Sequence, residues 1–364
     1  MQRSRIPSVL ATEANTVGAP RPLISVIVPV RNEAGTIERL LGELVGQDYD
    51  PARFEVIVVD GQSTDATREI VERLQPHHAN LKLLSNPKRW SSAGRNHGIQ
   101  AAAGEILLII DGHCVVGTSA YLSQLAEVFS RSGADCVGRP QPLDIEGAAP
   151  LQRAIAAARS SWLGHHPDSH IYSSAEQFVR PQSVAIAYRR SVIEAVGLFD
   201  EEFDACEDVE FNNRVELAGF RCFFSPQVRV CYHPRTSLGG LFWQMARYGR
   251  GRMRLWRKHP KTFTWACFLP AILMLGVLLG PVPAWLSPWL ATAYVAALGA
   301  YGTIVLAVSG AIAWTSRDRG LGPWLPFIFI AIHFGAGTGI LGEWVRGWWR
   351  RSTNATVVLS EPSR

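Results

Sequence analysis

Charge is scarce in this chain, and one long region lacks it altogether. Charged residues make up 18% of the 364 residues, and no Asp, Glu, Lys or Arg occurs between Lys261 and Arg317. This argues against a wholly water-soluble protein, because the chain is too short to build a second large core around such a stretch. Residues 262–316 are instead long enough for two membrane-crossing helices of about 20 residues, with a turn at residues 280–283. Residues 321–342 form a third apolar candidate.

Paired cysteines and a leader segment are also missing. The six cysteines show no CxxC spacing, which argues against a disulfide scaffold and predicts reduced thiols. Residues 1–21 contain no apolar segment of the kind that a secretory signal requires, so the catalytic part is expected to remain in the cytoplasm. The formal net charge of +5 is too small for a nucleic-acid-binding surface, and we expect no nucleic acid partner.

Basic residues gather immediately before the first apolar segment. They are Arg247, Arg250, Arg252, Arg254, Arg257, Lys258 and Lys261. Such a cluster faces anionic lipid headgroups and marks the cytoplasmic side, which puts the turn at residues 280–283 outside. A third crossing would then carry Arg346, Arg350 and Arg351 outside, against the positive-inside rule. Either the last segment is re-entrant or interfacial, or the charge bias is overridden, so two and three crossings both stay open.

The first two thirds of the chain alternate between buried strands and helical stretches, which is typical of an α/β sheet covered on both faces. Strands are expected at residues 24–30, 54–59, 105–110 and 183–188, with an extended segment at 221–232. Helices are expected at residues 36–44, 65–74, 120–129, 151–162 and 207–217. In open α/β sheets ligands bind at the carboxyl ends of the strands, so the polar residues that follow each strand are the candidate site.

The strongest of these polar tails is Asp111-Gly112-His113, which follows the third strand. A carboxylate and an imidazole one residue apart can both turn toward one divalent ion, with glycine relieving the bend. Taken alone, the same three residues fit equally well a turn that carries a surface histidine. The tails at residues 28–33 and 58–65 add further carboxylates and amides at the same edge of the sheet.

An ordered set of motifs resembles family 2 glycosyltransferases of the GT-A fold. The motifs are Val28-Pro-Val-Arg-Asn-Glu33, Val59-Asp-Gly-Gln-Ser-Thr-Asp-Ala-Thr67, Asp111-Gly-His113, Gly197-Leu-Phe-Asp-Glu201, Glu207-Asp208 and Gln244-x-x-Arg247-Tyr248. The likeness spans about residues 23–257. With its apolar tail, the chain is most similar to the membrane-anchored bacterial enzymes of the succinoglycan-type exopolysaccharide glucosyltransferase group. Tyr248 departs from the tryptophan that processive members of this family carry in the last motif, which leaves open whether Arg247 serves the donor or only the basic helix.

The resemblance implies a role for each matching residue. Asp60 would hold the nucleoside base, with Pro29, Arg31 and Glu33 lining its pocket. Arg95, Asn96 and Arg247 would lie near the nucleotide-sugar. Asp111, His113 and His233 would coordinate a divalent cation, Mn²⁺ or Mg²⁺; the His233 assignment follows the metal ligands of the polypeptide N-acetylgalactosaminyltransferases, which Asp111-Gly-His113 also resembles. Imidazole among the ligands favours Mn²⁺ over Mg²⁺.

The second reactant must lose a hydroxyl proton, and Asp208 is the candidate base. The residue opens a predicted helix, whose dipole favours an ionised carboxylate, and Glu207 would position the acceptor or the base. A base opposite the leaving diphosphate gives inversion, whereas the likeness to the N-acetylgalactosaminyl enzymes leaves retention as an alternative. A Rossmann dehydrogenase is not supported, because no GxGxxG follows the first strand. A nucleotidyltransferase of similar fold would want a Gly-rich, Lys-bearing loop there instead of Arg31-Asn32-Glu33.

The expected protein is therefore an α/β enzyme of the GT-A class, a mixed and mostly parallel sheet with helices on both faces, followed by C-terminal transmembrane helices. Its parts would be a flexible tail (1–22), a catalytic domain (23–240), a basic juxtamembrane helix (241–261), two or three membrane helices (262–345) and a polar tail (346–364). We expect a multi-pass protein of the inner membrane with its catalytic domain in the cytoplasm. It would transfer sugar from a nucleotide-diphosphate donor, UDP-sugar above all, to a lipid-linked saccharide acceptor in polysaccharide biosynthesis.

Overall fold

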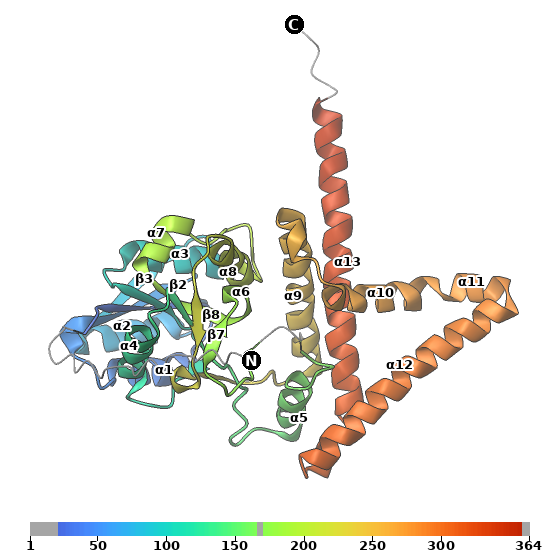
Figure 1. Cartoon of the computed structure of the whole chain (residues 1–364), viewed down its shortest axis with the longest axis horizontal. Coiled ribbons are helices and arrows are strands. Elements are labelled where there is room, and N and C mark those ends of the chain that lie inside the picture. The colour runs from blue at the N-terminus through green and yellow to red at the C-terminus, as the bar shows by residue number, and fades with distance from the viewer. Residues whose placement is uncertain (1–20, 166–169, 359–364) are drawn as a thin grey trace, which may run out of the picture.

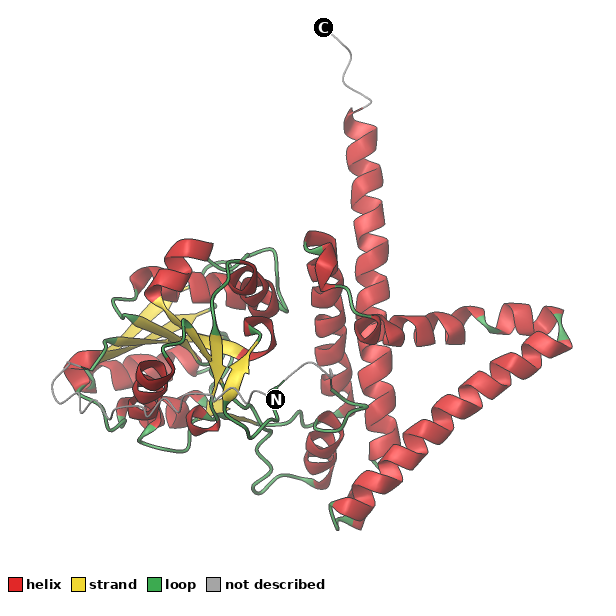
Figure 2. Ribbon diagram, viewed as in Figure 1, coloured by secondary structure: helices red, strands yellow, loops and turns green. Residues whose placement is uncertain are grey.

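A computed structural model of the chain describes residues 21–165 and 170–358. Most of the expected 1–22 tail and the last residues of the expected 346–364 tail lie outside these ranges. The α/β domain carries all the strands of the described residues, and the region from α9 onward is helical apart from short connections (Figure 2). In Figure 1, α9 lies between the α/β domain and the long helix α13.

The strands are β1 (Ile24–Val30), β2 (Phe54–Asp60), β3 (Leu81–Ser85), β4 (Ile106–Ile109), β5 (Cys114–Val115), β6 (Cys136–Gly138), β7 (Gln177–Val179), β8 (Ala185–Arg189), β9 (Cys222–Phe224) and β10 (Cys231–Tyr232). Eight of them form one sheet in the order β3-β2-β1-β4-β8-β6-β9-β7, while β10 pairs with β5 in a short ribbon. The pairs β1/β2, β1/β4, β2/β3 and β6/β9 are parallel and the rest of the large sheet is antiparallel.

The helices of the α/β domain are α1 (Ile37–Val45), α2 (Thr67–Leu74), α3 (Ser91–Ala101), α4 (Tyr121–Ser132), α5 (Pro150–Arg159), α6 (Pro181–Val184), α7 (Arg190–Val196) and α8 (Glu207–Leu217). Those of the helical region are α9 (Leu238–Lys258), α10 (Trp265–Leu279), α11 (Pro281–Leu286), α12 (Pro288–Thr315) and α13 (Leu325–Val358). Short 3₁₀ turns lie at Pro51–Arg53, Gln75–His77, Pro226–Val228, Pro260–Thr262 and Arg319–Leu321.

Helices cover both faces of the sheet because alternate residues of its central strands point to opposite sides. Val26 and Val28 of β1 belong to a core shared with α1, α2 and α4. Ile27 between them belongs to a second core, shared with α3, α7 and α8. The expected architecture, a mixed and mostly parallel sheet between two helical layers, is confirmed.

Several boundaries differ from the expected ones for local reasons. The turn predicted at residues 280–283 is wrong: Pro281 and Pro283 begin the helix α11, and the chain reverses at Ser287. Proline is well tolerated in the first turn of a helix, where its missing N–H would have no partner anyway. The strand expected at residues 183–188 begins only at Ala185, because Pro181 opens the short helix α6. β3 and α3 have no counterpart among the sequence-based elements.

Candidate active site

The parallel register brings three polar tails to one edge of the sheet. Val30 of β1 lies opposite Asp60 of β2, and β4 pairs with the other side of β1 and ends beside it. The tails after β1 and β2 are tied together, since Asn32 N–H donates to the Ser63 hydroxyl (2.9 Å) and Thr64 N–H donates to the Asn32 side chain (2.8 Å). Asn32 adopts a left-handed φ of 58°, a conformation that asparagine tolerates. The predicted gathering of these tails is therefore present.

Asp60, the last residue of β2, lies at this edge and is only 2% exposed. One carboxylate oxygen accepts from the Ser63 N–H at 3.1 Å, and Arg68 lies 3.8 Å from the other. Gly61, the next residue, packs against backbone: an added Cβ would lie 3.1 Å from the Arg89 carbonyl oxygen. Asp60 is thus held in one orientation by its own turn.

Arg95 of α3 connects the end of β4 to the start of α8. Its guanidinium lies 3.2 Å from Asp111 and 3.4 Å from Glu207, and the residue is 7% exposed. The Nε atom has no hydrogen-bond partner among the described residues, so the guanidinium keeps unused donor capacity. Arg95 therefore contacts both Asp111, which follows β4, and Glu207, which lies on the same helix as the candidate base Asp208.

The two carboxylates that share Arg95 have pKa values displaced in opposite directions. Burial raises the pKa of Asp111, but the charges of Arg95, His113 and Arg139 outweigh it, so the pKa lies below its ordinary value. Burial also raises the pKa of Glu207, and there Arg95 does not compensate, because the nearby charge of Asp208 acts in the same direction as burial. Asp111 is therefore ionised, and Glu207 holds a proton more readily than an ordinary glutamate.

His113 is positioned by Glu33. The Nδ1 atom lies 3.1 Å from a Glu33 oxygen, and burial, which lowers the His113 pKa, is outweighed by Glu33 and Asp111, which raise it. The ring also packs against Tyr232, with centroids 5.3 Å apart. When Nδ1–H donates to a carboxylate, Nε2 is the nitrogen left for a metal, an arrangement that recurs around metal-binding histidines.

His233 is the residue after β10, whose last pair joins Tyr232 to Cys114, the residue after His113. The Nδ1 atom of His233 lies 3.9 Å from Asp144. The described residues contain no preformed group of three His, Cys, Asp or Glu side chains with metal-binding geometry. A carboxylate and two imidazoles are nevertheless donor types that suit a divalent cation.

Asp208 lies in the first turn of α8, next to Glu207, and is exposed. One carboxylate oxygen accepts from the Val209 N–H at 2.8 Å, as expected for an acid at a helix N-terminus. Cys206 precedes the helix with φ of 60°, which turns the chain sharply into α8. Of the three acids in this turn, Asp208 is exposed, whereas Glu207 and Glu210 are buried.

The remaining predicted binding residues are placed differently from one another. Asn96 is buried. Its side-chain amide donates to the Phe199 carbonyl and to Glu201 and accepts from the Phe199 N–H, so it holds the 199–201 loop. Arg31 is exposed at the edge, and Pro29 packs against Gly94. Arg247 of α9 donates to the Asp204 carbonyl at 2.7 Å, beside the turn into α8.

Two residues near Asp111 have no signal in the sequence. Arg139, just after β6, is 1% exposed and donates to the Tyr121 hydroxyl (2.6 Å) and the Ile109 carbonyl (3.3 Å). Tyr232 donates its hydroxyl to Asp111 at 3.3 Å. Both come from strands far from Asp111 in the chain, and only the fold of the sheet brings them there.

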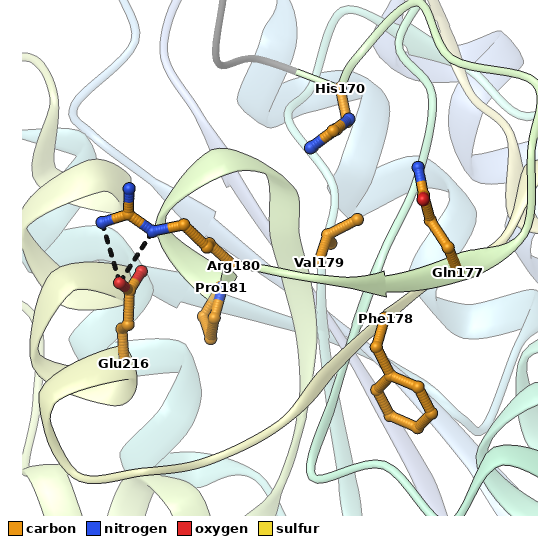
Figure 3. A pocket seen from close by; sticks show the side chains of 7 residues that line it. All are labelled: His170, Gln177, Phe178, Val179, Arg180, Pro181 and Glu216. Atoms are coloured by element: carbon orange, nitrogen blue, oxygen red, sulfur yellow. Dashed lines mark hydrogen bonds and ion pairs between the residues drawn. The ribbon is translucent and has the colours of Figure 1, made fainter.

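A hollow of about 420 Å³ lies elsewhere, beside the edge strand β7 (Figure 3). It is lined by His170, Gln177, Phe178, Val179, Arg180, Pro181 and Glu216. Arg180 and Glu216 form an ion pair across it at 2.8 Å. Since β7 stands at one end of the strand order and β1, β2 and β4 stand toward the other, this hollow is separate from the acidic edge.

Comparison with known proteins places the chain among transferases. The model of the family described as "Glycosyl transferase family 2" matches residues 25–197, a span that includes the tails of β1, β2 and β4. The model described as "Glycosyl transferase family group 2" matches residues 121–306.

Individual relatives agree with these matches. The chain is 34% identical over 236 residues to the "Succinoglycan biosynthesis protein ExoA" of Rhizobium meliloti (strain 1021), covering 64% of this chain and 70% of that protein. It is 30% identical over 236 residues to "Glycosyltransferase AglE" of Haloferax volcanii, covering 65% and 74%. The fold is shared with the mannosyltransferase PcManGT from Pyrobaculum calidifontis, solved with GDP-Man and Mn²⁺, at a TM-score of 0.56, 24% identity and 88% coverage of each chain.

Proposed function

The chain belongs to glycosyltransferase family 2, and from this premise we propose that it transfers a sugar from a UDP-sugar to a lipid-linked saccharide at a membrane, with inversion at the anomeric carbon. The enzyme acts in the biosynthesis of a polysaccharide or glycoconjugate. In this proposal residues 23–240 form the catalytic part, 241–261 the juxtamembrane helix and 262–345 the membrane part, after a polar tail at 1–22. The polar tail expected at 346–364 needs a correction, because helix α13 continues to Val358.

One observation carries the proposal: Arg95 contacts both Asp111 at 3.2 Å and Glu207 at 3.4 Å. This guanidinium ties the edge where a donor diphosphate would bind to the helix turn where an acceptor hydroxyl would be activated. A displacement reaction needs both groups within one site, on opposite sides of the reacting carbon.

Donor binding falls to the edge of the sheet. Asp60, fixed by its own turn, accepts from the nucleoside, with Pro29 and Arg31 beside it. Asp111, His113 and His233 would hold the divalent cation, which neutralises the charge that develops on the leaving diphosphate. Glu33 orients His113 through Nδ1, and Arg95 lends a second positive charge to the same region. PcManGT, which shares the fold, was solved with GDP-Man and Mn²⁺, and this supports a nucleotide-sugar donor and a divalent cation in general.

Asp208 takes the proton from the acceptor hydroxyl. The residue is accessible, and its helix N-terminus favours the ionised form that a base requires. Glu207, buried against Arg95, positions this turn and keeps Arg95 in place. Asn96 acts indirectly, because its amide holds the 199–201 loop that leads toward the same turn, and Arg247 steadies that turn from α9.

A membrane acceptor is supported by three helices that are long and apolar enough to cross a bilayer: Trp265–Leu286, Pro288–Thr315 and Leu325–Trp349. The basic residues of α9 favour the cytoplasmic side of an inner membrane for the catalytic domain. Succinoglycan biosynthesis, the role named for the 34% identical relative, is a polysaccharide pathway and supports an exopolysaccharide product.

The proposal is tested with membranes that contain the expressed protein, radiolabelled nucleotide-sugars and Mn²⁺ or Mg²⁺. We expect label from a UDP-sugar to enter the lipid phase only when a divalent cation is present. Proton NMR of the released product should show an anomeric configuration opposite to that of the donor. Retained configuration would overturn the assignment of Asp208 as base. Transfer of a nucleotidyl group from CTP, in place of a sugar from a sugar nucleotide, would overturn the proposed reaction.

A further inference from the structure

Helices α9 and α13 lie side by side and run in the same direction. An added Cβ on Gly335 would meet the Phe242 carbonyl at 2.5 Å, and one on Gly339 would meet the Ala246 carbonyl at 2.0 Å. An added Cβ on Gly249 would likewise meet the Ala336 carbonyl of α13 at 2.2 Å. The two backbones therefore touch where these glycines lie, and α9 accompanies α13 along its apolar part (Figure 1).

α9 carries many cationic side chains, and one of them ties it to the α/β domain. We therefore expect this helix to stay outside the hydrocarbon of a membrane. Arg254 lies 3.1 Å and Arg257 3.4 Å from Glu343 of α13, and Glu343 is 6% exposed. Arg254 also pairs with Asp204 at 2.8 Å, which fixes α9 to the α/β domain. Moving these charges to the centre of a bilayer would cost several kcal/mol.

The hairpin formed by α10, α11 and α12 has a different character. Trp265–Leu286 and Pro288–Thr315 carry no charged residue, and their windows are only 6% and 11% buried in the protein. At ~1.5 Å per residue each is long enough to cross a hydrocarbon core of about 30 Å. In Figure 1 this hairpin points away from the α/β domain and leaves α13 in a crosswise direction.

The first end of the hairpin lies near the α/β domain, because Lys258, at the end of α9, pairs with Glu210 of α8 at 2.8 Å. At the other end, Asp318 accepts a hydrogen bond at 3.1 Å from Arg153 of α5, a helix that packs with α9 and α13. A hairpin that crosses a membrane twice would therefore return the chain to the catalytic side before α13 begins.

The face of α13 that turns away from α9 is apolar. α10 crosses the middle of this face, where an added Cβ on Gly337 would meet the Pro270 carbonyl at 2.5 Å and the Thr338 hydroxyl donates to the Met274 sulfur. On either side of this crossing the face is exposed, at Phe327 (59%), Ile330 (43%), Val345 (45%) and Trp348 (62%). Glu343, Gly335 and Gly339 face the other way, toward α9.

We propose that α13 does not cross the membrane but lies in its interface beside α9, with its apolar face in the lipid, and that only the hairpin of α10 to α12 spans the bilayer. The surface recognised is a lipid leaflet, and the C-terminal end of α13 stays on the catalytic side. This topology keeps Arg346, Arg350 and Arg351 with the other basic residues, in agreement with the positive-inside rule. It holds whichever sugar the enzyme transfers.

Fusions to the full chain test the topology. A green fluorescent protein attached after Arg364 should fluoresce in a bacterial host, and alkaline phosphatase attached at the same residue should be inactive. The reverse pattern would mean an odd number of crossings and would overturn the proposal. A fusion at residue 284, within the hairpin, calibrates both reporters, since it should give the opposite pair of signals.

Depth measurements on the intact protein provide a second test that does not depend on fusions. Phe327→Cys, Phe334→Cys and Val345→Cys each receive a spin label in a background with Cys231→Ser and Cys267→Ser, and the protein is reconstituted in vesicles. The first and last positions are about 27 Å apart along the helix axis at ~1.5 Å per residue. We expect equal, shallow depths at all three. A depth that peaks at Phe334 would show a crossing helix and would overturn the proposal.

Discussion

Two clusters of arginine and carboxylate side chains in this molecule differ in the balance of their charges. In the α/β domain, the single guanidinium of Arg95 serves Asp111 and Glu207, with Asp208 alongside. Between α9 and α13, Arg254 and Arg257 share Glu343, and Asp204 completes the balance. The first cluster has more carboxylates than cations, whereas the second is matched.

The difference separates a reactive site from a structural joint. Burial, and after it the charge of Asp208, raises the pKa of Glu207. The cluster has more carboxylates than cations, and a divalent cation would neutralise this excess. The matched cluster uses both oxygens of Glu343 and leaves no capacity for a ligand. The same residue types can thus form either a site for a charged ligand or a contact between two helices. The balance between carboxylates and cations distinguishes the two cases.

The largest effect is expected at the edge of the unbalanced cluster. Asp208→Asn removes the base and should lower sugar transfer by about 10²- to 10⁴-fold. Glu216→Gln, on the same helix but outside the site, is the matched control and should retain activity. Initial rates with saturating donor measure both. A variant Asp208→Asn with more than a tenth of normal activity would show that this carboxylate is not the base.

The ion pairs that Glu210 of α8 forms with Arg214 and with Lys258 at the end of α9 should dominate acid stability. Burial alone raises the Glu210 pKa, but hydrogen bonds from Arg214, Lys258 and His259 outweigh it and lower the pKa from 4.5 to about 2. Its contribution, about 3 kcal/mol, is therefore complete above pH 4.5 and lost as pH falls toward 2.

Glu210→Gln tests this contribution through the Tm measured at a series of pH values. The variant should melt well below the parent at pH 7, and the gap should narrow below pH 4.5. Glu72→Gln, which breaks only the exposed pair with Arg68, is the control and should change the Tm little. A gap that stays constant down to pH 3 would mean that Glu210 is not held ionised by its partners.

The next effect concerns the orientation of His113. Glu33→Ala removes the acceptor at Nδ1 and should raise the Mn²⁺ concentration needed for half-maximal activity by about 10- to 100-fold. Glu38→Ala, an exposed acid of α1, should leave that concentration unchanged. If both variants respond alike, Glu33 has no special relation to the metal.

The smallest effect is expected at the joint between α9 and α13. Glu343→Gln should lower the free energy of unfolding by about 1–2 kcal/mol, since it weakens charge-assisted hydrogen bonds from two arginines. Affinity for UDP should not change, and calorimetry on the solubilised protein measures it. A loss of UDP affinity would show that the contact between α9 and α13 also affects donor binding, and would contradict the division between the two clusters.

Much of the fold could be predicted from the sequence because its central strands are continuous apolar runs that end in polar tails. Residues 24–30 and 54–60 needed no tertiary information to be read as buried strands. β3 and α3 escaped prediction because Leu81–Ser85 is short and only half buried, and Ser91–Ala101 is rich in glycine and polar residues. Their structure depends on neighbours supplied by the rest of the fold.

The site was partly predictable for the same reason. Asp60 and Asp111 follow strands directly, so the sequence places these two at one edge of the sheet, whereas Asp208 was predicted only as an acid at the start of a helix. The contact of Arg95 with Glu207 joins α3 to α8, and Arg139 reaches Asp111 from β6; no local pattern encodes either. The role of Glu33 beside His113 likewise emerges only when the tails of β1 and β4 meet.

Calorimetric titration of UDP with and without Mn²⁺ tests the central claim most directly, on the parent protein and on Asp111→Asn, His113→Ala and Asp208→Asn. The account predicts that Mn²⁺ strengthens UDP binding to the parent and to Asp208→Asn alike, and that this gain disappears in the other two variants. Equal loss of the gain in all three, or its survival without Asp111 and His113, would contradict a metal site separate from the base.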